Sequence, residues 1–188
     1  FRRVLFRSGA SNDFLVRSGV LEVRQSIFAY MGGGDDALAI SAAARIRRDA
    51  FVYMGEGNDT FAMNAGEAHR NLYVDLGNGS DSVNFDGALA THGVSITGGT
   101  GDKLISINNS RIADFFNVMT SSGNDTVVIK GSVLGDDVYI QSGLGDDTVV
   151  IDNSKLRDYA TIDTSMGNDF VQISPTTTIG DDVNVFLG

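Results

Sequence analysis

Cysteine and tryptophan are absent from this chain of 188 residues, which also has only one proline and two histidines. Without cysteine there can be no disulfide framework, no thiolate zinc site and no cysteine nucleophile. The two histidines, His69 and His92, leave little for a histidine-based metal site. Long apolar runs are missing as well, since none approaches the roughly 20 residues of a membrane-spanning helix. The composition therefore predicts no membrane span and excludes several common kinds of catalytic centre.

Basic residues are in the minority. The chain has 14 Lys and Arg against 24 Asp and Glu, which gives a formal net charge of −10. Nucleic acids and anionic membranes both attract positively charged protein surfaces. The charge therefore argues against a nucleic-acid partner and suits either a soluble surface protein or one that binds cations.

Both ends of the chain are unusual. Residues 1–8 (FRRVLFRS) resemble one translated frame of a common sequencing-library adapter, so we interpret them as non-native. The last residues, NVFLG at 184–188, copy part of a repeat and stop before its turn is complete. Because a repeat array needs capping repeats at its ends, we expect residues 9–188 to be a single array truncated at both ends, a piece of a longer chain.

Glycine is abundant and regularly spaced. Turns such as GEGNDTFAM, SSGNDTVVI and GLGDDTVVI recur, each with an acidic residue near its end. In nearly every repeat glycine stands two positions before this residue, and Asn, Asp or Ser stands one before. Glycine followed by Asn or Asp favours positive φ, so we predict a tight turn in each repeat. The column of turn-ending residues, spaced by 22 or 23, is Asp13, Asp36, Asp59, Asp81, Lys103, Asp125, Asp147 and Asp169.

Strand patterns follow each turn. Apolar residues lie two and four positions past the column, an alternation typical of a strand with one buried face. These pairs are Leu38 and Ile40, Phe61 and Met63, Val83 and Phe85, Ile105 and Ile107, Val127 and Ile129, Val149 and Ile151, and Val171 and Ile173. A second apolar pair, from Ile27 and Ala29 to Val183 and Val185, follows in every repeat. A single apolar residue between the two strands is expected to fill a corner: Val23, Ile46, Ala68, Ala90, Ile112, Leu134, Leu156 and Ile179.

Two strands and a corner, repeated at nearly constant length, predict an all-β fold: a right-handed parallel β-helix or β-solenoid of about eight coils of 22–23 residues. The handedness follows from the right-handed preference of parallel crossover connections. Coils stacked at roughly 4.8 Å would extend over about 38 Å. An alanine-rich stretch at 41–50 is also compatible with a helix, but the repeat places it at a corner.

The turn, as in GEGNDTF at 55–61, resembles the G-G-x-G-x-D-x-apolar-x nonapeptide of the repeats-in-toxin (RTX) family. In that family the aspartate and turn carbonyls bind Ca²⁺ between successive coils, so the resemblance implies calcium ligands here. The resemblance is incomplete, because most repeats lack the first glycine, Lys103 replaces one aspartate, and each full coil has one such turn. The implied metal ligands are Asp36, Asp59, Asp81, Asp125, Asp147 and Asp169.

Stacked carboxylates raise an electrostatic question. At about 4.8 Å they repel by roughly 3.5 kcal/mol per neighbouring pair at an effective dielectric constant of 20. Bound Ca²⁺ would offset this repulsion, and so would turn N–H groups directed at each carboxylate. Lys103 would act locally by neutralising both Asp81 and Asp125 and excluding a cation. The sequence leaves calcium binding and an ordinary backbone-bonded aspartate both open.

The uniform repeat leaves few residues for a unique site, and no catalytic residue is assigned. We predict a non-enzymatic, secreted or cell-surface structural repeat module, similar to an adhesin stalk or spacer, with bacterial origin implied by the RTX resemblance alone. A calcium-binding RTX-like β-roll module is the first alternative. A polysaccharide-active β-helix is the second, although outward positions such as Ala62, Ser106 and Val128 are mostly neutral. The expected partner is a surface glycan or a protein, and the sequence does not decide which.

Overall fold

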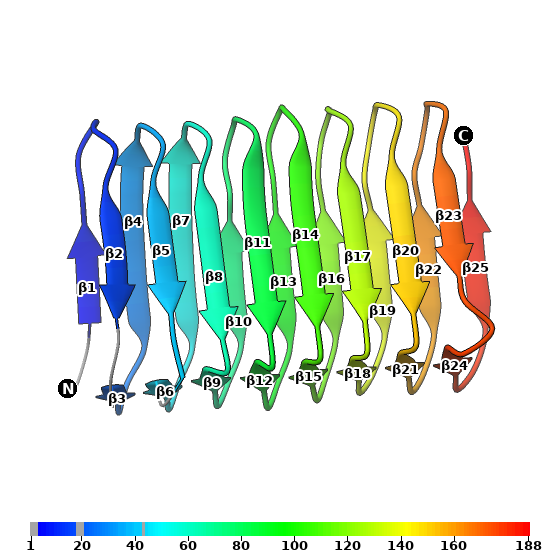
Figure 1. Ribbon diagram of the computed structural model, residues 1–188, viewed down its shortest axis with the longest axis horizontal. Coiled ribbons are helices and arrows are strands. Elements are labelled where there is room, and N and C mark those ends of the chain that lie inside the picture. The colour runs from blue at the N-terminus through cyan, green and yellow to red at the C-terminus, as the bar shows by residue number, and fades with distance from the viewer. Residues whose placement is uncertain (1–3, 18–20, 43) are drawn as a thin grey trace.

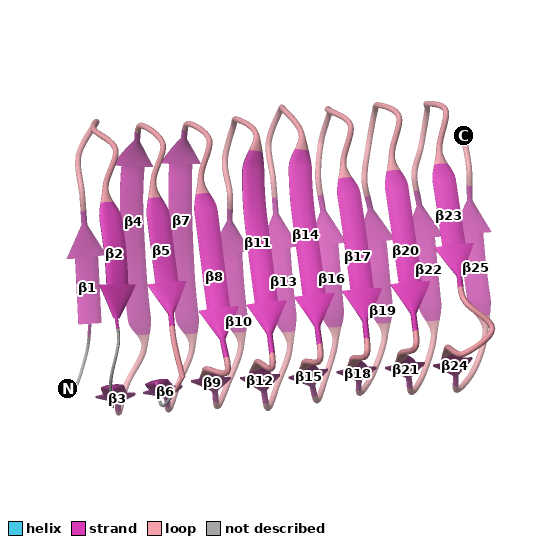
Figure 2. Ribbon diagram, in the orientation of Figure 1, coloured by secondary structure: helices cyan, strands magenta, loops and turns pink. Residues whose placement is uncertain are grey.

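The computed structural model describes residues 4–17, 21–42 and 44–188. These residues contain 25 β-strands and no helix, and the strands form three parallel sheets (Figure 1, Figure 2). The predicted all-β solenoid of about eight coils is therefore confirmed. The alanine-rich stretch that also suited a helix contains strand β6 (Ala44–Ile46) instead.

Sheet A lies at the back in Figure 1 and has nine strands, and sheet B lies in front with eight. Sheet A consists of β1 (Val4–Arg7), β4 (Ile27–Gly33), β7 (Ala50–Glu56), β10 (Leu72–Asp75), β13 (Val94–Thr97), β16 (Phe116–Met119), β19 (Val138–Gln141), β22 (Ala160–Asp163) and β25 (Val183–Phe186). Sheet B consists of β2 (Phe14–Arg17), β5 (Ala37–Ile40), β8 (Thr60–Asn64), β11 (Asp81–Asp86), β14 (Lys103–Asn108), β17 (Thr126–Lys130), β20 (Thr148–Asp152) and β23 (Phe170–Ile173).

A third strand in each coil, which the sequence pattern did not predict, forms sheet C along the lower edge in Figure 1. The apolar residue expected to fill the corner is the last residue of this short strand. The strand pairs with the equivalent strands of the coils on either side. The strands are β3 (Leu21–Val23), β6, β9 (Glu67–Ala68), β12 (Leu89–Ala90), β15 (Arg111–Ile112), β18 (Val133–Leu134), β21 (Lys155–Leu156) and β24 (Thr178–Ile179).

The path of the chain determines the handedness of the solenoid. Followed from left to right in Figure 1, the chain rises along sheet A, crosses the upper edge to sheet B, descends, and returns through sheet C. This is a right-handed coil, as the crossover preference predicts. Equivalent residues of successive coils pair in register, so Ile105 lies beside Val83 in one coil and Val127 in the next.

The core is one continuous apolar column between the sheets. Both predicted apolar pairs point inward, and residues such as Phe61, Ile105 and Ile140 are fully buried. Phe61 and Phe85 meet edge to face with ring centroids 6.0 Å apart. Burying a side chain of this size contributes about 1.5–3 kcal/mol relative to leaving it exposed, so stacked coils stabilise one another.

Strand β1 includes part of the segment interpreted as non-native. Its residues pair with β4, Val4 with Ile27 and Phe6 with Ala29, while residues 1–3 lie outside the described residues. A foreign segment with alternating apolar residues can add to the edge of a sheet, so the origin of residues 1–8 stays a prediction. Among the described residues no helix is long and apolar enough to cross a membrane.

Candidate functional site

The acidic column lies at the turns that join sheet A to sheet B, along the upper edge in Figure 1. Glycine is required two residues before it because successive turns touch through their backbones. Gly57 has φ 134° and Gly79 has φ 130°, a region that side chains strongly disfavour. A Cβ on Gly57 would also overlap the carbonyl oxygen of Gly34 in the preceding coil. The spacing of the glycines is therefore a consequence of how closely the turns stack.

The structure brings all six predicted calcium ligands into one stack, and five of them are buried. Asp36, Asp59, Asp81, Asp125 and Asp147 each have 1–2% of their surface exposed. Carboxyl groups are almost never buried to this extent without partners. What each carboxyl group contacts therefore decides the chemistry of the turn.

One carboxylate oxygen of each aspartate is bonded to the backbone. Oδ1 accepts a hydrogen bond from the N–H group of the column residue one coil earlier, at distances from 2.7 to 2.9 Å. This is the backbone-bonded arrangement that the sequence left open, and it includes the carboxyl group in the hydrogen-bond ladder between coils. The donor–acceptor pairs are Asp13 with Asp36, Asp36 with Asp59, Asp59 with Asp81, Lys103 with Asp125, Asp125 with Asp147, and Asp147 with Asp169.

The residue just before the column forms a second ladder in the opposite direction. Its N–H group donates to the side-chain oxygen of the equivalent Asn or Asp one coil earlier, as Asn58 does to Asp35 at 2.8 Å. Asp146 bonds Asn124 in the same way at 2.9 Å. Short polar side chains thus bridge the coils where the strands are interrupted, which gives a physical reason for the recurrent Asn-Asp and Asp-Asp pairs.

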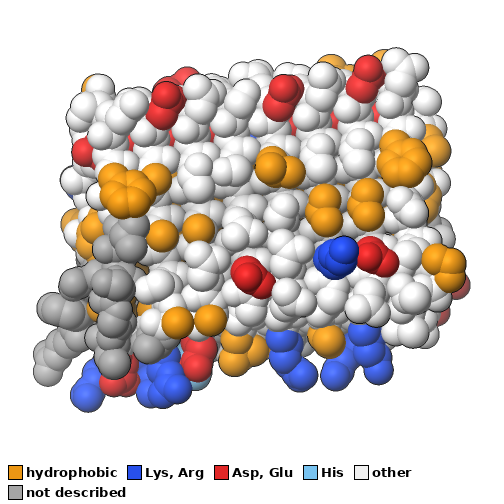
Figure 3. All heavy atoms as spheres, viewed as in Figure 1, with side chains coloured by type: hydrophobic (Ala, Val, Ile, Leu, Met, Phe, Trp, Pro, Cys, Tyr) orange, Lys and Arg blue, Asp and Glu red, His pale blue; other side chains and the backbone are white. Residues whose placement is uncertain are grey.

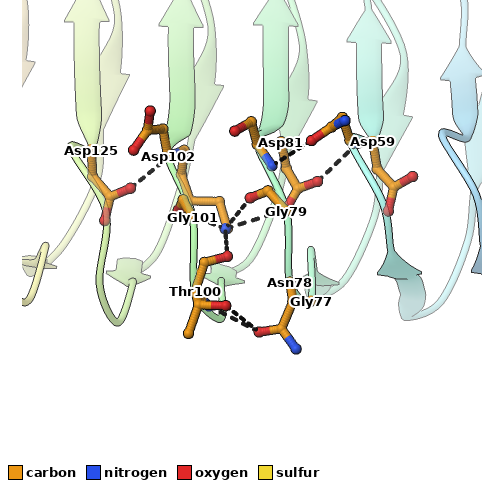
Figure 4. Close-up of polar contacts among 12 residues, drawn as sticks. Asp59, Gly77, Asn78, Gly79, Asp81, Thr100, Gly101, Asp102 and Asp125 are labelled. Carbon is orange, nitrogen blue, oxygen red and sulfur yellow. Dashed lines mark hydrogen bonds and ion pairs between the residues drawn. The ribbon is translucent and has the colours of Figure 1, made fainter.

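Lys103 is the one basic member of the column, and its side chain is fully buried. Its ammonium group donates to three turn carbonyl oxygens, those of Gly79 at 2.6 Å, Gly101 at 2.8 Å and Thr100 at 2.9 Å (Figure 4). Oδ2 of Asp81 lies 3.3 Å from the same nitrogen. The cation therefore sits among four oxygen atoms contributed by two adjacent coils.

Lys103 was expected to neutralise both Asp81 and Asp125, and the structure differs from this expectation. The ammonium group pairs with Asp81 alone, while Asp125 is bonded through the backbone N–H of Lys103. The lysine also lacks the carboxylate that would accept the Asp81 N–H group, which donates instead to the carbonyl of Asp102 at 3.0 Å. Gly98 provides the space, because a Cβ there would lie 2.7 Å from Cε of Lys103.

The second carboxylate oxygen, Oδ2, lacks the backbone partner that Oδ1 has. Oδ2 is buried and accepts no hydrogen bond in Asp36, Asp59, Asp125 and Asp147. Burial raises the pKa of all four carboxyl groups, partly opposed by backbone hydrogen bonds, and it raises the pKa of Asp59 to about 6. Burial also raises the pKa of Asp81, although Lys103 opposes it. The raised pKa favours the neutral form of these carboxyl groups, which weakens the repulsion between them.

The residue five positions before the column differs between the earlier and the later coils. Thr164 donates to Oδ2 of Asp169 at 2.8 Å, and the nearby hydroxyl groups of Thr120 and Ser142 lower the pKa of Asp125 and Asp147 against the larger effect of burial. In the coils of Asp36, Asp59 and Asp81 the same position holds a buried apolar side chain. These residues are Met31, Met54 and Leu76.

This division bears on calcium. Ca²⁺ takes six to eight oxygen ligands. In the coils of Asp36, Asp59 and Asp81 the residue five positions before the aspartate is apolar, and Asp81 already faces the ammonium group of Lys103, so these turns offer fewer side-chain oxygen ligands. Among the six predicted ligands, Asp125, Asp147 and Asp169 are those with a hydroxyl residue five positions before the aspartate.

A second acidic group, which the sequence analysis did not single out, lies at the opposite corner. Carboxylate oxygens of Asp136, Asp137 and Asp158 lie within 4.8 Å of one another. A hydrogen bond with Asp114, burial and the neighbouring carboxylates raise the pKa of Asp136. Asp137 is exposed and the other two are half-buried, as in an ordinary solvated corner.

The outer face of sheet A carries stacked aromatic rings that the sequence analysis also missed. Phe28, Phe51 and Tyr73 occupy one outward column, and Tyr30 and Tyr53 occupy the next. The signal was present in the outward positions of the second strand, where aromatic residues recur at the repeat spacing.

No protein-family model matches the chain, and no curated protein or solved structure matches it. The RTX resemblance and a bacterial origin are therefore still predictions. The structure itself defines the class of fold, a parallel β-solenoid.

Proposed function

We propose that this chain is a non-enzymatic structural segment of a secreted or cell-surface protein, acting as a stiff spacer. The observation that carries the proposal is the continuity of hydrogen bonding along the axis: three parallel sheets pair every coil with the next. At the turns, where strands are interrupted, the two side-chain ladders continue the same bonding. A chain bonded in this way resists bending at its turns as well as in its sheets.

The surface facing outward from sheet B supports a structural role. It is mostly uncharged, with acidic side chains along the upper edge, mainly basic ones along the lower edge, and a few charged side chains between them (Figure 3). A polysaccharide-active β-helix would need charged groups clustered on one strand face. An activity screen on acidic polysaccharides is expected to release no new reducing ends, and release of such ends would favour the enzymatic alternative.

Location is tested separately. Antibodies raised against the chain should label intact cells of the source organism, or detect the protein in the medium. Labelling that appears only after lysis would contradict a secreted or cell-surface spacer. A cytosolic marker protein serves as the control for cell integrity.

A calcium-binding module is the second candidate, favoured by the buried unbonded Oδ2 atoms of Asp125 and Asp147 beside hydroxyl groups. Calorimetric titration and thermal unfolding with calcium separate the two candidates. A purely structural segment gives no heat and no rise in melting temperature at about millimolar calcium, whereas a ligand at 100 times its Kd adds about 2.7 kcal/mol of stability. If binding is seen, Ser142→Ala should weaken it and Met54→Ala should not.

A further inference from the structure

The aromatic ladder on the outer face of sheet A stops abruptly between β10 and β13, which are neighbouring strands (Figure 1). The ring centroids of Phe28 and Phe51 are 5.0 Å apart, and those of Phe51 and Tyr73 are 5.1 Å apart, with nearly parallel planes. The next residue in this column is Ser95, which pairs with Tyr73. One face of the Tyr73 ring is therefore not covered by another aromatic ring.

The parallel column ends one coil earlier. Tyr30 and Tyr53 stack with centroids 4.9 Å apart and an interplanar angle of 5°. Asp75 follows Tyr53 in this column, and Thr97 follows Asp75. Because large rings give way to small polar residues, the sheet surface has a step at this place.

A cavity of about 170 Å³ occupies the step. We define it as the ladder notch, lined by Tyr53, Tyr73, Asp75, Ser95 and Thr97 together with Val52 and Val74. Its walls combine aromatic rings with two hydroxyl groups and one carboxylate. Sites for small molecules commonly have this composition, an apolar surface with a few polar groups that fix the ligand's orientation.

We propose that the ladder notch binds one neutral pyranose ring of a glycan. A pyranose placed above Ser95 would continue the ladder as its next ring, with its apolar C–H face against Tyr73. Aromatic faces carry partial negative charge and attract such C–H groups. The hydroxyl groups at the edge of the sugar ring would form hydrogen bonds with Ser95, Thr97 and Asp75. These hydroxyl groups would then have partners, while the C–H face of the sugar lies against Tyr73.

The charge of the notch selects the class of sugar. Asp75 already accepts a hydrogen bond from the N–H group of Gly77 at 3.2 Å through Oδ1. Its carboxylate accepts hydrogen bonds from sugar hydroxyl groups but repels an acidic sugar, and the chain's formal charge of −10 acts in the same direction. Neutral hexoses and pentoses therefore fit, and uronic acids do not. This inference concerns a binding site and holds whether or not the solenoid also serves as a spacer.

Nuclear magnetic resonance titration of the ¹⁵N-labelled chain tests the proposal. The probes are cellohexaose, xylohexaose and mannohexaose, with hexagalacturonate as the acidic comparison. At least one neutral probe should shift the amide signals of Ser95 and Thr97, with a dissociation constant on the order of 1 mM because a single open subsite buries little of the ligand. Hexagalacturonate should not shift them in the native chain.

Two matched substitutions sharpen the test. Ser95→Tyr would insert a ring into the ladder notch and should weaken binding by about tenfold or more, which corresponds to about 1.4 kcal/mol. Thr161→Tyr is the control, because Thr161 occupies the same outward column beside Tyr139, three coils away from Ser95. It should leave binding unchanged. Asp75→Asn should allow hexagalacturonate to bind.

Three results would overturn the proposal. The first is no shift at Ser95 and Thr97 with any neutral probe at about tenfold above the expected dissociation constant. The second is equal weakening by Ser95→Tyr and Thr161→Tyr. The third is a set of shifts confined to another surface. Melting temperatures of the variants, compared with the native chain, show that each is folded.

Discussion

The turns of the earlier coils and those of the later coils hold equivalent aspartates in different surroundings. Around Asp59 the neighbouring buried side chain is apolar, Met54, and burial raises the pKa of the carboxyl group to about 6. Around Asp169 the neighbour is Thr164, whose hydroxyl group donates to the second carboxylate oxygen. Between the two groups lies a coil in which Lys103 occupies the column.

The difference shows that the repeat requires the hydrogen bond to Oδ1 of the aspartate and tolerates variation around Oδ2. Oδ1 must accept the N–H group of the preceding coil, and it does so in both groups. Oδ2 has no such partner in the repeat, and its surroundings differ between coils: a hydroxyl group donates to it at Asp169, an ammonium group lies beside it at Asp81, and at Asp59 it has no hydrogen-bond partner. The predictions below test this division, starting with the largest expected effect.

Replacing the buried lysine should be the most damaging change. Lys103→Met keeps the side-chain volume but leaves Asp81 and three turn carbonyls without their cation. Removing one partner of a buried ion pair costs about 3–5 kcal/mol, to be measured as the free energy of unfolding in urea. Lys155→Met, at an exposed position in sheet C, is the control and should change stability by less than about 0.5 kcal/mol.

A double substitution should convert this coil to the earlier type. Lys103→Asp alone leaves the space beside Gly98 empty, whereas Gly98→Met with Lys103→Asp reproduces the pairing of Met54 with Asp59. We expect the double variant to be more stable than Lys103→Asp alone, because both restore an acceptor for the Asp81 N–H group but only the double variant fills the cavity. Equal stability of the two variants would mean that the two positions do not act together.

Mild acid should stabilise the chain. The pKa of Asp59 is raised from an ordinary value of 3.8 to about 6 in the folded state, so between these pH values the folded chain holds a proton that the unfolded chain has released. Stability then rises as pH falls through the folded pKa, by about 1–2 kcal/mol between about pH 7.5 and pH 5. The melting temperature measured across this range checks the sign.

Asp59→Asn is the matched variant for the pH experiment. Its side-chain oxygen can still accept the N–H group of Asp36, but it has no proton to gain. The rise in melting temperature on acidification should therefore be smaller than in the native chain. A melting temperature that falls between about pH 7.5 and pH 5 in the native chain would contradict the raised pKa values.

Hydroxyl groups should matter only in the later coils, and with the smallest effect. Thr120→Val removes the hydrogen bond to the carbonyl of Ser142, made at 2.7 Å, and a contact that lowers the pKa of Asp125. The expected loss is about 1–2 kcal/mol. Met54→Leu at the equivalent earlier position should cost less than about 1.5 kcal/mol, since it conserves volume and removes no donor. Equal effects would remove the distinction between the two groups.

Much of the fold could be predicted from the chain alone because its coils repeat. The period of 22 or 23 residues, the inward pairs such as Ile105 and Ile107, and the turn glycines all followed from spacing, and the structure confirms them. The short strands of sheet C were not predicted, because two or three residues are too few for an alternating pattern. The stacked rings were not predicted, because outward positions carry no burial signal.

The candidate sites depend more heavily on the tertiary structure. Spacing alone determined that seven aspartates and one lysine share a column, because each residue takes its place from the period. Which atoms they contact was decided only when coils stacked at hydrogen-bond distance. That stacking directs Oδ1 to the preceding backbone, encloses Oδ2, and places the ammonium group of Lys103 against Asp81 and not Asp125. The physical reason is that a repeat sets the order of residues along the axis, whereas burial and hydrogen bonding depend on the side chain that each adjacent coil contributes.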